Sequence, residues 1–228
     1  IYNAINSCIA FVPSLEGKQL LLVEDLVSKS GNLHPVQKAM VNYHGSQCGF
    51  CTPGFVMSLF AMYQNYSNYD EKLIQDSISG NLCRCTGYRP IIDAAKSLKN
   101  KNKLNQFKKN IKKTINLLKK IKPKTISISH GNKKYFAPKT INELKKFIKQ
   151  QPNSKFLSGG TDLSLIVTKE RKDLENIIYL NSIDELNYIN KKSNYIEVGA
   201  TTSLRKFELF ISKYYSDFDE ILRRYGSI

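Results

Sequence analysis

The spacing of apolar residues predicts helices in the first half of the chain. From Asp25 to Leu98, apolar residues recur three and four positions apart, which is typical of amphipathic helices. Proline near the start of a segment and glycine after its end are common helix boundaries. These signals predict four short helices, which begin near Pro35, Pro53, Asp70 and Pro90.

The second half mixes helical spacing with short apolar runs, so the chain is predicted to be α+β. Thr140 precedes a predicted helix, and Glu143 stands at its third position as in a capping box. Asp162 and Thr202 are predicted to cap two further helices. The predicted helices are Ile141–Lys149, Leu163–Val167 and a segment through Leu204 and Phe207, and the predicted strands are Phe156–Ser158, Asn176–Leu180 and Tyr195–Ala200.

The first 24 residues form a short separate segment. Cys8 lies in an apolar run, where a lone cysteine is usually a packed small side chain. Glu16–Lys18 is typical of a tight turn and Gln19–Glu24 of a short strand, so this segment is a hairpin-like remnant. We therefore expect four parts: residues 1–24, a helical domain at 25–98, a linker at 99–127 and an α+β region at 128–228.

Composition indicates the compartment. With 41% hydrophobic residues, 228 residues can fill two modest cores. The sequence has no apolar run of about 18 residues and no signal-peptide pattern at its start. Five cysteines, four of them closely spaced, fit a reducing compartment with thiolate ligands. We expect a cytoplasmic protein without a membrane partner. The start without Met and the end at Tyr225–Ile228 lead us to expect a fragment.

Charge is concentrated in one stretch. The net charge is +16, and eleven lysines without any acid lie between Lys99 and Lys124. The stretch is predicted to be a lysine-rich surface helix or a partly ordered linker. A dedicated nucleic-acid patch would usually interleave arginine and exposed aromatic residues, so nucleic acid is an unlikely partner on this pattern.

Four cysteines form the strongest chemical pattern. Cys48 and Cys51 form C-x2-C, and after 31 residues Cys83 and Cys85 form C-x-C. Gly-rich turns before helix starts let the backbone wrap a metal centre and direct N–H groups at the sulfurs. The pattern predicts ligation of a metal or cluster, and the spacing alone leaves zinc and iron–sulfur as equal alternatives.

The three histidines show no such pattern. His34, His44 and His130 have no neighbouring cysteine or histidine at ligand spacing, so they are predicted to be surface or capping residues.

A family resemblance distinguishes between the two metal alternatives. Ser46–Gly54 and Gly80–Ile91 resemble the second [2Fe-2S] motif of the molybdenum hydroxylases, most closely that of the small subunit of bacterial xanthine dehydrogenases. The resemblance implies an all-α four-helix domain whose cluster ligands are Cys48, Cys51, Cys83 and Cys85. It also implies that Gln47 and Cys85 lie nearest to the molybdopterin of a partner chain.

The same resemblance gives Cys8 a different role. Members of the family place a plant-type ferredoxin before the helical domain, with ligands in C-x4-C-x2-C and a distant fourth cysteine. Asn6–Ile9 resembles the site of that fourth ligand. The resemblance therefore implies that residues 1–24 are the C-terminal part of the ferredoxin and that Cys8 is a ligand. Because this sequence lacks the first three cysteines, we expect one complete and one partial cluster site.

A glycine pair in the second half is a candidate phosphate site. Gly159-Gly160 lies between a predicted strand and helix, where backbone N–H groups can bind an anion, although an ordinary tight turn is the simpler interpretation. The run resembles the first FAD-binding loop of the family's flavin domain, and Val198–Thr202 also resembles that domain. Since a further Gly-Gly-Asn flavin loop is not in the sequence, we expect weakened FAD affinity. The implied FAD-binding residues are Lys155, Phe156, Leu157, Ser158, Gly159, Gly160, Thr161 and Asp162.

The resemblance implies an electron-transfer subunit of an oxidoreductase. In the family, a molybdenum centre on another chain hydroxylates the substrate, and electrons pass through [2Fe-2S] clusters to FAD and then to NAD. We therefore expect a large molybdenum-cofactor-binding subunit as partner in a hetero-oligomer, and no carboxylate here as an acid–base catalyst. Three alternatives stay open: a sister enzyme that oxidises an aldehyde, carbon monoxide or an N-heterocycle; a zinc-stabilised nucleic-acid-binding module; and a defective remnant with one cluster.

Overall fold

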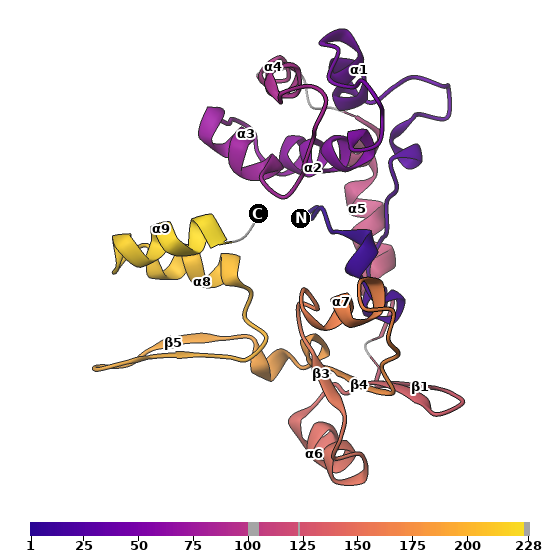
Figure 1. Cartoon of the computed structure of the whole chain (residues 1–228), viewed down its shortest axis with the longest axis vertical. Coiled ribbons are helices and arrows are strands. Elements are labelled where there is room, and N and C mark those ends of the chain that lie inside the picture. The colour runs from indigo at the N-terminus through magenta and orange to yellow at the C-terminus, as the bar shows by residue number, and fades with distance from the viewer. Residues whose placement is uncertain (100–104, 123, 226–228) are drawn as a thin grey trace. The chain divides into compact units, whose positions relative to one another are not determined.

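The computed structural model describes residues 1–99, 105–122 and 124–225, and these divide into two compact units (Figure 1). Unit 1 contains Ile1–Ile5, Gln19–Lys120 and the end of the chain from Arg223, and unit 2 contains Asn6–Lys18 and Ile121–Leu222. Part of the lysine-rich stretch, including Lys101 and Lys103, and the last three residues of the sequence, 226–228, lie outside the described residues. Within the described residues, no helix is long and apolar enough to cross a bilayer.

Unit 1 is helical, and four of its helices lie where the sequence predicted them. Asp70 caps the third helix as expected, because its carboxylate accepts a hydrogen bond from the Leu73 N–H at 2.8 Å. The fifth helix shows that the described part of the lysine-rich stretch is a surface helix. The helices are α1 (Pro35–Asn42), α2 (Thr52–Asn65), α3 (Glu71–Ile78), α4 (Arg89–Lys96) and α5 (Gln106–Lys119).

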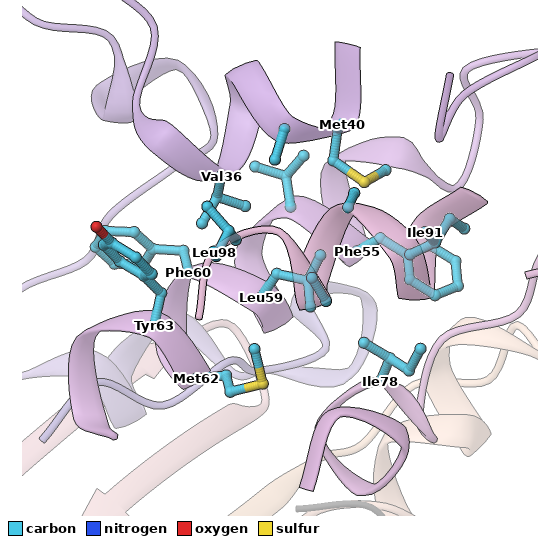
Figure 2. Packing of buried hydrophobic residues seen from close by; sticks show 14 of the residues in the cluster. Val36, Met40, Phe55, Leu59, Phe60, Met62, Tyr63, Ile78, Ile91 and Leu98 are labelled. Carbon is cyan, nitrogen blue, oxygen red and sulfur yellow. The ribbon is translucent and has the colours of Figure 1, made fainter. Parts of the chain in front are cut away.

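Helix α2 lies at the centre of the core of unit 1 (Figure 2). Phe55, Leu59 and Tyr63 are fully buried on it, at spacings of four residues that place them on one helix face. Val36 of α1 and Ile91 of α4 are equally buried and pack in the same cluster. Ile74 and Ile78 of α3 are buried there too, so the core fixes all four helices whose ends carry the cysteine loops.

His34 is a buried cap, which confirms capping as its predicted role. It precedes α1, its Nδ1 accepts a hydrogen bond from the Val36 N–H at 3.3 Å, and only 4% of the residue is exposed. Its Nε2 lies 3.3 Å from the side-chain nitrogen of Gln64, and the Gln64 side-chain oxygen has no hydrogen-bond partner among the described residues. Because Nδ1 accepts, a neutral ring carries its proton on Nε2, and exchanging the nitrogen and oxygen positions of the Gln64 amide would let that oxygen accept it. Burial lowers the pKa of His34 to about 4.

Unit 2 is built on a four-stranded sheet of order β1-β2-β4-β3. Strands β1 (Ile126–His130) and β2 (Lys133–Ala137) form an antiparallel hairpin that the sequence analysis did not predict. Strands β3 (Lys155–Leu157) and β4 (Asn176–Tyr179) pair in parallel, as β2 and β4 do. Helix α6 (Ile141–Gln150) packs on β2, since the rings of Phe147 and Phe136 stack at 4.0 Å.

The caps of unit 2 agree only partly with the sequence. Thr140 accepts from the Glu143 N–H at 3.2 Å as predicted, but the Glu143 carboxylate accepts from the Lys139 N–H instead of completing the box. The cap of helix α8 (Leu204–Ile211) is Ser203, so the prediction of Thr202 is wrong. Thr202 instead donates its hydroxyl proton to the Tyr188 carbonyl at 2.9 Å. The remaining elements are α7 (Leu163–Thr168), β5 (Ile189–Lys191), β6 (Ile196–Val198) and α9 (Ser216–Tyr225).

The first 24 residues differ most from expectation. All of them are described, and they contain only short 3-10 turns at η1 (Ser7–Ile9), η2 (Val12–Leu15) and η3, which starts at Glu24 and ends at Leu26. The predicted strand at Gln19–Glu24 is therefore wrong. Leu20 and Leu22 are about half exposed and no strand pairs with this segment. A strand needs a partner strand, and within the described residues this run has none; the Leu22 N–H instead donates to the Asp25 carboxylate at 2.8 Å.

Candidate metal centre

Two loops of unit 1 carry the four cysteines to one place. The first loop follows α1 and ends at Cys51, which directly precedes α2. The second loop lies between α3 and α4 and contains Cys83 and Cys85. Gly49 (φ +83°) and Gly87 (φ +66°) adopt left-handed conformations that side chains disfavour, so the tight turns require glycine at these points. The two loops, held between buried helices, therefore bring Cys48 and Cys51 close to Cys83 and Cys85.

The sulfur atoms meet two by two. The Sγ atoms of Cys48 and Cys85 are 3.4 Å apart, and the side chains of Cys51 and Cys83 form a second sulfur–sulfur hydrogen bond. Each pair therefore combines one cysteine from each loop. Nowhere in the described residues do three or more His, Cys, Asp or Glu side chains converge as a site for a metal ion requires.

Each pair contains one thiol with a lowered pKa and one with a raised pKa. Hydrogen bonding from the Phe50 backbone and from Cys85 lowers the pKa of Cys48, whereas the bond to Cys48 raises the pKa of Cys85. Hydrogen bonds from Thr86 lower the pKa of Cys83 to about 7. Burial raises the pKa of Cys51. Each pair thus combines a more acidic and a less acidic cysteine that share a proton, and binding of a metal would replace that proton.

The loop before Cys83 is fixed to α2. Asn81 donates from its side-chain amide to the Ser58 hydroxyl at 2.7 Å. A Cβ on Gly54 would lie 2.8 Å from the side-chain oxygen of Asn81, so only glycine permits this close approach. The sequence analysis assigned no role to Asn81 or Ser58, although an Asn beside a cysteine turn is a signal that could have indicated one.

One side of the site is exposed and apolar. Cys48 and Cys85 are exposed, whereas Cys51 and Cys83 are half-buried. Phe50 directly precedes Cys51 and is 94% exposed, and Leu82 directly precedes Cys83 and is 83% exposed. Gln47 is exposed beside Cys48. Large apolar side chains held this far from the core are typical of a surface that another protein covers. The sequence analysis did not identify Phe50 or Leu82.

Cys8 is not part of this group. It lies in η1 of unit 2 with an exposed side chain, and its N–H donates to the Asn6 side chain at 3.1 Å. The next residue, Ile9, accepts a hydrogen bond from Ser164 of α7 at 2.8 Å. The structure thus places the Cys8 segment beside the helix that follows the glycine pair.

The glycine pair forms a strand–turn–helix, as predicted. β3 ends at Leu157, and Gly160 (φ +81°) turns the chain toward α7. A Cβ on Gly160 would lie 3.1 Å from both Leu157 and Ser164, whereas a Cβ on Gly159 would enter open space. Asp162 is the N-cap residue of α7, as predicted, although its side chain makes no capping hydrogen bond. Thr161 and Asp162 are exposed, and the Ser158 hydroxyl donates to Asn181 at 2.7 Å.

Comparison with known families identifies both units. Residues 22–96 match the [2Fe-2S] binding domain, and residues 127–228 match the FAD binding domain in molybdopterin dehydrogenase. The two matches cover most of the chain and correspond to the cysteine loops and to the glycine pair. The chain therefore carries the [2Fe-2S]-binding and FAD-binding domains of the molybdenum hydroxylase family.

Individual relatives place these domains in larger oxidoreductases. The chain is 30% identical to the xanthine dehydrogenase of Emericella nidulans over all of its own length and 19% of that protein. It is 56% identical to the xanthine dehydrogenase of Blastobotrys adeninivorans over 42% of this chain and 7% of that protein. It is 30% identical to human aldehyde oxidase over 89% of this chain and 18% of that protein. The chain thus spans about a fifth, or less, of the length of these relatives.

Proposed function

We propose that Cys48, Cys51, Cys83 and Cys85 bind one [2Fe-2S] cluster and that the chain transfers electrons between a molybdenum centre and a flavin. The observation that supports this proposal most strongly is the meeting of the four sulfurs as two pairs. A [2Fe-2S] cluster has two irons with two thiolates each. Under this proposal one iron takes Cys48 and Cys85, and the other takes Cys51 and Cys83.

The geometry favours this cluster over zinc. A structural zinc site gathers four ligands tetrahedrally around one ion, at about 2.3 Å from each sulfur. The four cysteines would have to leave their pairs to form such a site, whereas a two-iron cluster would be held by the two pairs as they stand. The hydrogen bonds to Cys83 and the backbone N–H directed at Cys48 also suit thiolate ligands whose charge increases on reduction.

The flavin would bind at the glycine pair. The loop Lys155–Asp162 offers open space at Gly159, an exposed hydroxyl at Thr161 and the start of α7. These features suit the pyrophosphate of FAD, which needs close backbone approach and N–H donors. Bound FAD would supply two-electron chemistry, with NAD as the final acceptor.

The partner would be a molybdenum-cofactor-binding subunit. The exposed apolar side chains Phe50 and Leu82 belong to the same two loops as the exposed residues Cys48, Cys85 and Gln47. A partner that covers them would bring its molybdopterin close to the cluster ligands Cys85 and Cys48. The complex would be a cytoplasmic hetero-oligomer of the xanthine dehydrogenase type, and this chain would correspond to the small subunit found in bacteria. Cys8 would be one ligand of a second, partial cluster site.

The cluster tests this proposal directly. Purified chain should show the visible absorption bands of a [2Fe-2S] centre, and dithionite should bleach them. Cys51→Ser should abolish the bands, whereas Cys8→Ser, a matched loss of one thiol outside the pairs, should leave them. A chain that binds zinc and shows no visible bands would contradict the proposal and favour a zinc-stabilised module.

A sister enzyme is the second candidate, because human aldehyde oxidase matches as much as 89% of the chain. Both candidates give the chain the same electron-transfer role. They differ in the substrate of the assembled complex, so reduction of its flavin by xanthine or by an aldehyde would distinguish them.

A further inference from the structure

Cys83 receives two hydrogen bonds from one residue. The Thr86 hydroxyl lies 3.1 Å from the Cys83 sulfur, and the Thr86 N–H donates to the same sulfur at 3.4 Å. Turns in cluster-binding loops commonly direct backbone N–H groups at sulfur, but the hydroxyl belongs to the threonine side chain. Its contribution can therefore be removed without changing the backbone.

The direction of the hydroxyl proton follows from the state of Cys83 as a metal ligand. A ligating thiolate has no proton to donate, so the Thr86 hydroxyl is the donor in that contact. The Tyr88 N–H donates to Thr86 Oγ1 at 3.2 Å, which holds the hydroxyl oxygen in place and leaves its proton available for sulfur.

Tyr88 is itself held in place. Its hydroxyl accepts a hydrogen bond from the Cys83 N–H at 3.0 Å, and its ring packs edge-on against Phe55 at 6.1 Å. Its φ of +68° is unusual for a residue other than glycine and costs of order 1 kcal/mol. The loop retains this strained residue, which closes a circuit of hydrogen bonds through Cys83, Thr86 and Tyr88.

We propose that the Thr86 hydroxyl raises the reduction potential of the cluster bound at Cys83. This proposal rests on the cluster assignment proposed above. A reduced cluster carries one more negative charge, which is shared by its thiolate ligands, and a donor to sulfur stabilises that state more than the oxidised state. Tyr88 is the positioning residue that orients the donor.

Thr52 provides a matched control. It follows Cys51 directly, just as Thr86 follows Cys85, but its hydroxyl donates to Ser46 at 2.7 Å. In both cases, replacement by valine removes the hydroxyl of a threonine that directly follows a cysteine in the sequence. Only the replacement at Thr86 removes a donor to a ligand sulfur.

The test is a spectroscopic redox titration of the full chain and its variants Thr86→Val, Thr86→Ser and Thr52→Val. At a fixed applied potential, Thr86→Val should lower the ratio of reduced to oxidised cluster about tenfold, which corresponds to about 59 mV for one electron. Thr86→Ser should restore the ratio, and Thr52→Val should match the unchanged chain. Equal potentials in all proteins, or the same shift in both valine variants, would overturn the proposal.

Iron and visible absorption are measured first in every protein, which separates the two proposals. If the unchanged chain holds no cluster, the function proposed above fails and this inference fails with it. If only Thr86→Val loses the cluster, Thr86→Ala provides the same measurement. Loss in both Thr86 variants, with retention in Thr52→Val, would show that the residue holds the cluster and does not set its potential.

Discussion

The two units carry their candidate sites in different ways. In unit 1, the cysteine loops connect helices whose inward faces, including Phe55, Leu59 and Ile91, are fully buried in one large core. In unit 2, the glycine pair follows a strand of three residues, and the core beneath it is the small group Tyr135, Ala137, Leu157 and Ile177. A large core can hold ligands in place before a cofactor arrives. We therefore expect a preformed site in unit 1 and a site that FAD stabilises in unit 2.

The largest expected effect comes from removing core volume. Leu59→Ala in α2 should destabilise unit 1 by about 3–5 kcal/mol, because the side chain is fully buried and its surroundings cannot close the cavity. Leu157→Ala in β3 should cost unit 2 only about 2 kcal/mol, since the smaller core can relax. Hydrogen exchange resolved by peptide measures the two units separately. Equal losses would contradict the difference between the cores.

Acid should weaken unit 1 through His34. Its pKa is about 4 in the folded chain and 6.5 when unfolded, so the unfolded state binds the proton more readily. The stabilisation is complete above pH 6.5 and is lost as pH falls toward 4, with a total of roughly 3 kcal/mol and about 2 kcal/mol between pH 7 and pH 5.

A variant isolates this histidine from the acid lability of the cysteine site. His34→Asn keeps a side chain that can cap α1 but does not titrate. The free energy of unfolding of the unchanged chain minus that of His34→Asn should therefore fall between pH 7 and pH 5. His130→Asn, at an exposed position in β1, is the control and should leave the pH dependence unchanged. A difference that does not vary with pH would contradict a buried neutral His34.

Helix caps should have similar and smaller effects in both units. Asp70 caps α3 in unit 1 and Thr140 caps α6 in unit 2, each through one hydrogen bond to a backbone N–H. Replacement of either residue by alanine should cost about 1 kcal/mol. Faster hydrogen exchange should be confined to the first turn of the helix concerned. If Asp70→Ala instead makes hydrogen exchange faster throughout unit 1, while the effect of Thr140→Ala stays local, the core of unit 1 depends on α3 more than the burial of that helix indicates.

The smallest effect on stability and the clearest effect on binding are expected at Gly159. A Cβ there would meet no atom within 4 Å, so Gly159→Ala should change the free energy of unfolding by less than about 1 kcal/mol. The same methyl group would occupy the space proposed for the flavin pyrophosphate and weaken FAD binding. Quenching of flavin fluorescence measures the affinity. Gly131→Ala, in the β1–β2 turn, is a control for destabilisation of unit 2, because alanine is strained at the Gly131 φ of +57°. It should weaken FAD binding less than Gly159→Ala does, and equal affinity in both variants would contradict the proposed flavin site.

The helices of unit 1 could be predicted because their boundaries are local. Pro35, Pro53, Asp70 and Pro90 act on the first turn of their own helices, and the structure confirms all four starts within one residue. The strand expected at Gln19–Glu24 and the unpredicted hairpin β1–β2 show the opposite case. A strand depends on a partner, and an apolar run alone does not contain that information.

The candidate site could likewise be predicted from the sequence only as far as local signals describe it. Cysteine spacing indicates that four thiols converge, but it does not state that Cys48 meets Cys85 and Cys51 meets Cys83. The hydrogen bonds of Thr86 to the Cys83 sulfur depend on the conformation of the turn that carries both residues, which no residue pattern indicates. The exposure of Phe50 and Leu82 is also a tertiary property. Local signals thus predicted the ligands, and the fold supplied their pairing and environment.

The iron and acid-labile sulfide content of the purified Cys8→Ser chain tests the central claim most directly. Because the remaining four cysteines form two pairs, the account predicts about two irons and two sulfides per chain, with negligible zinc. One zinc per chain without sulfide would contradict it.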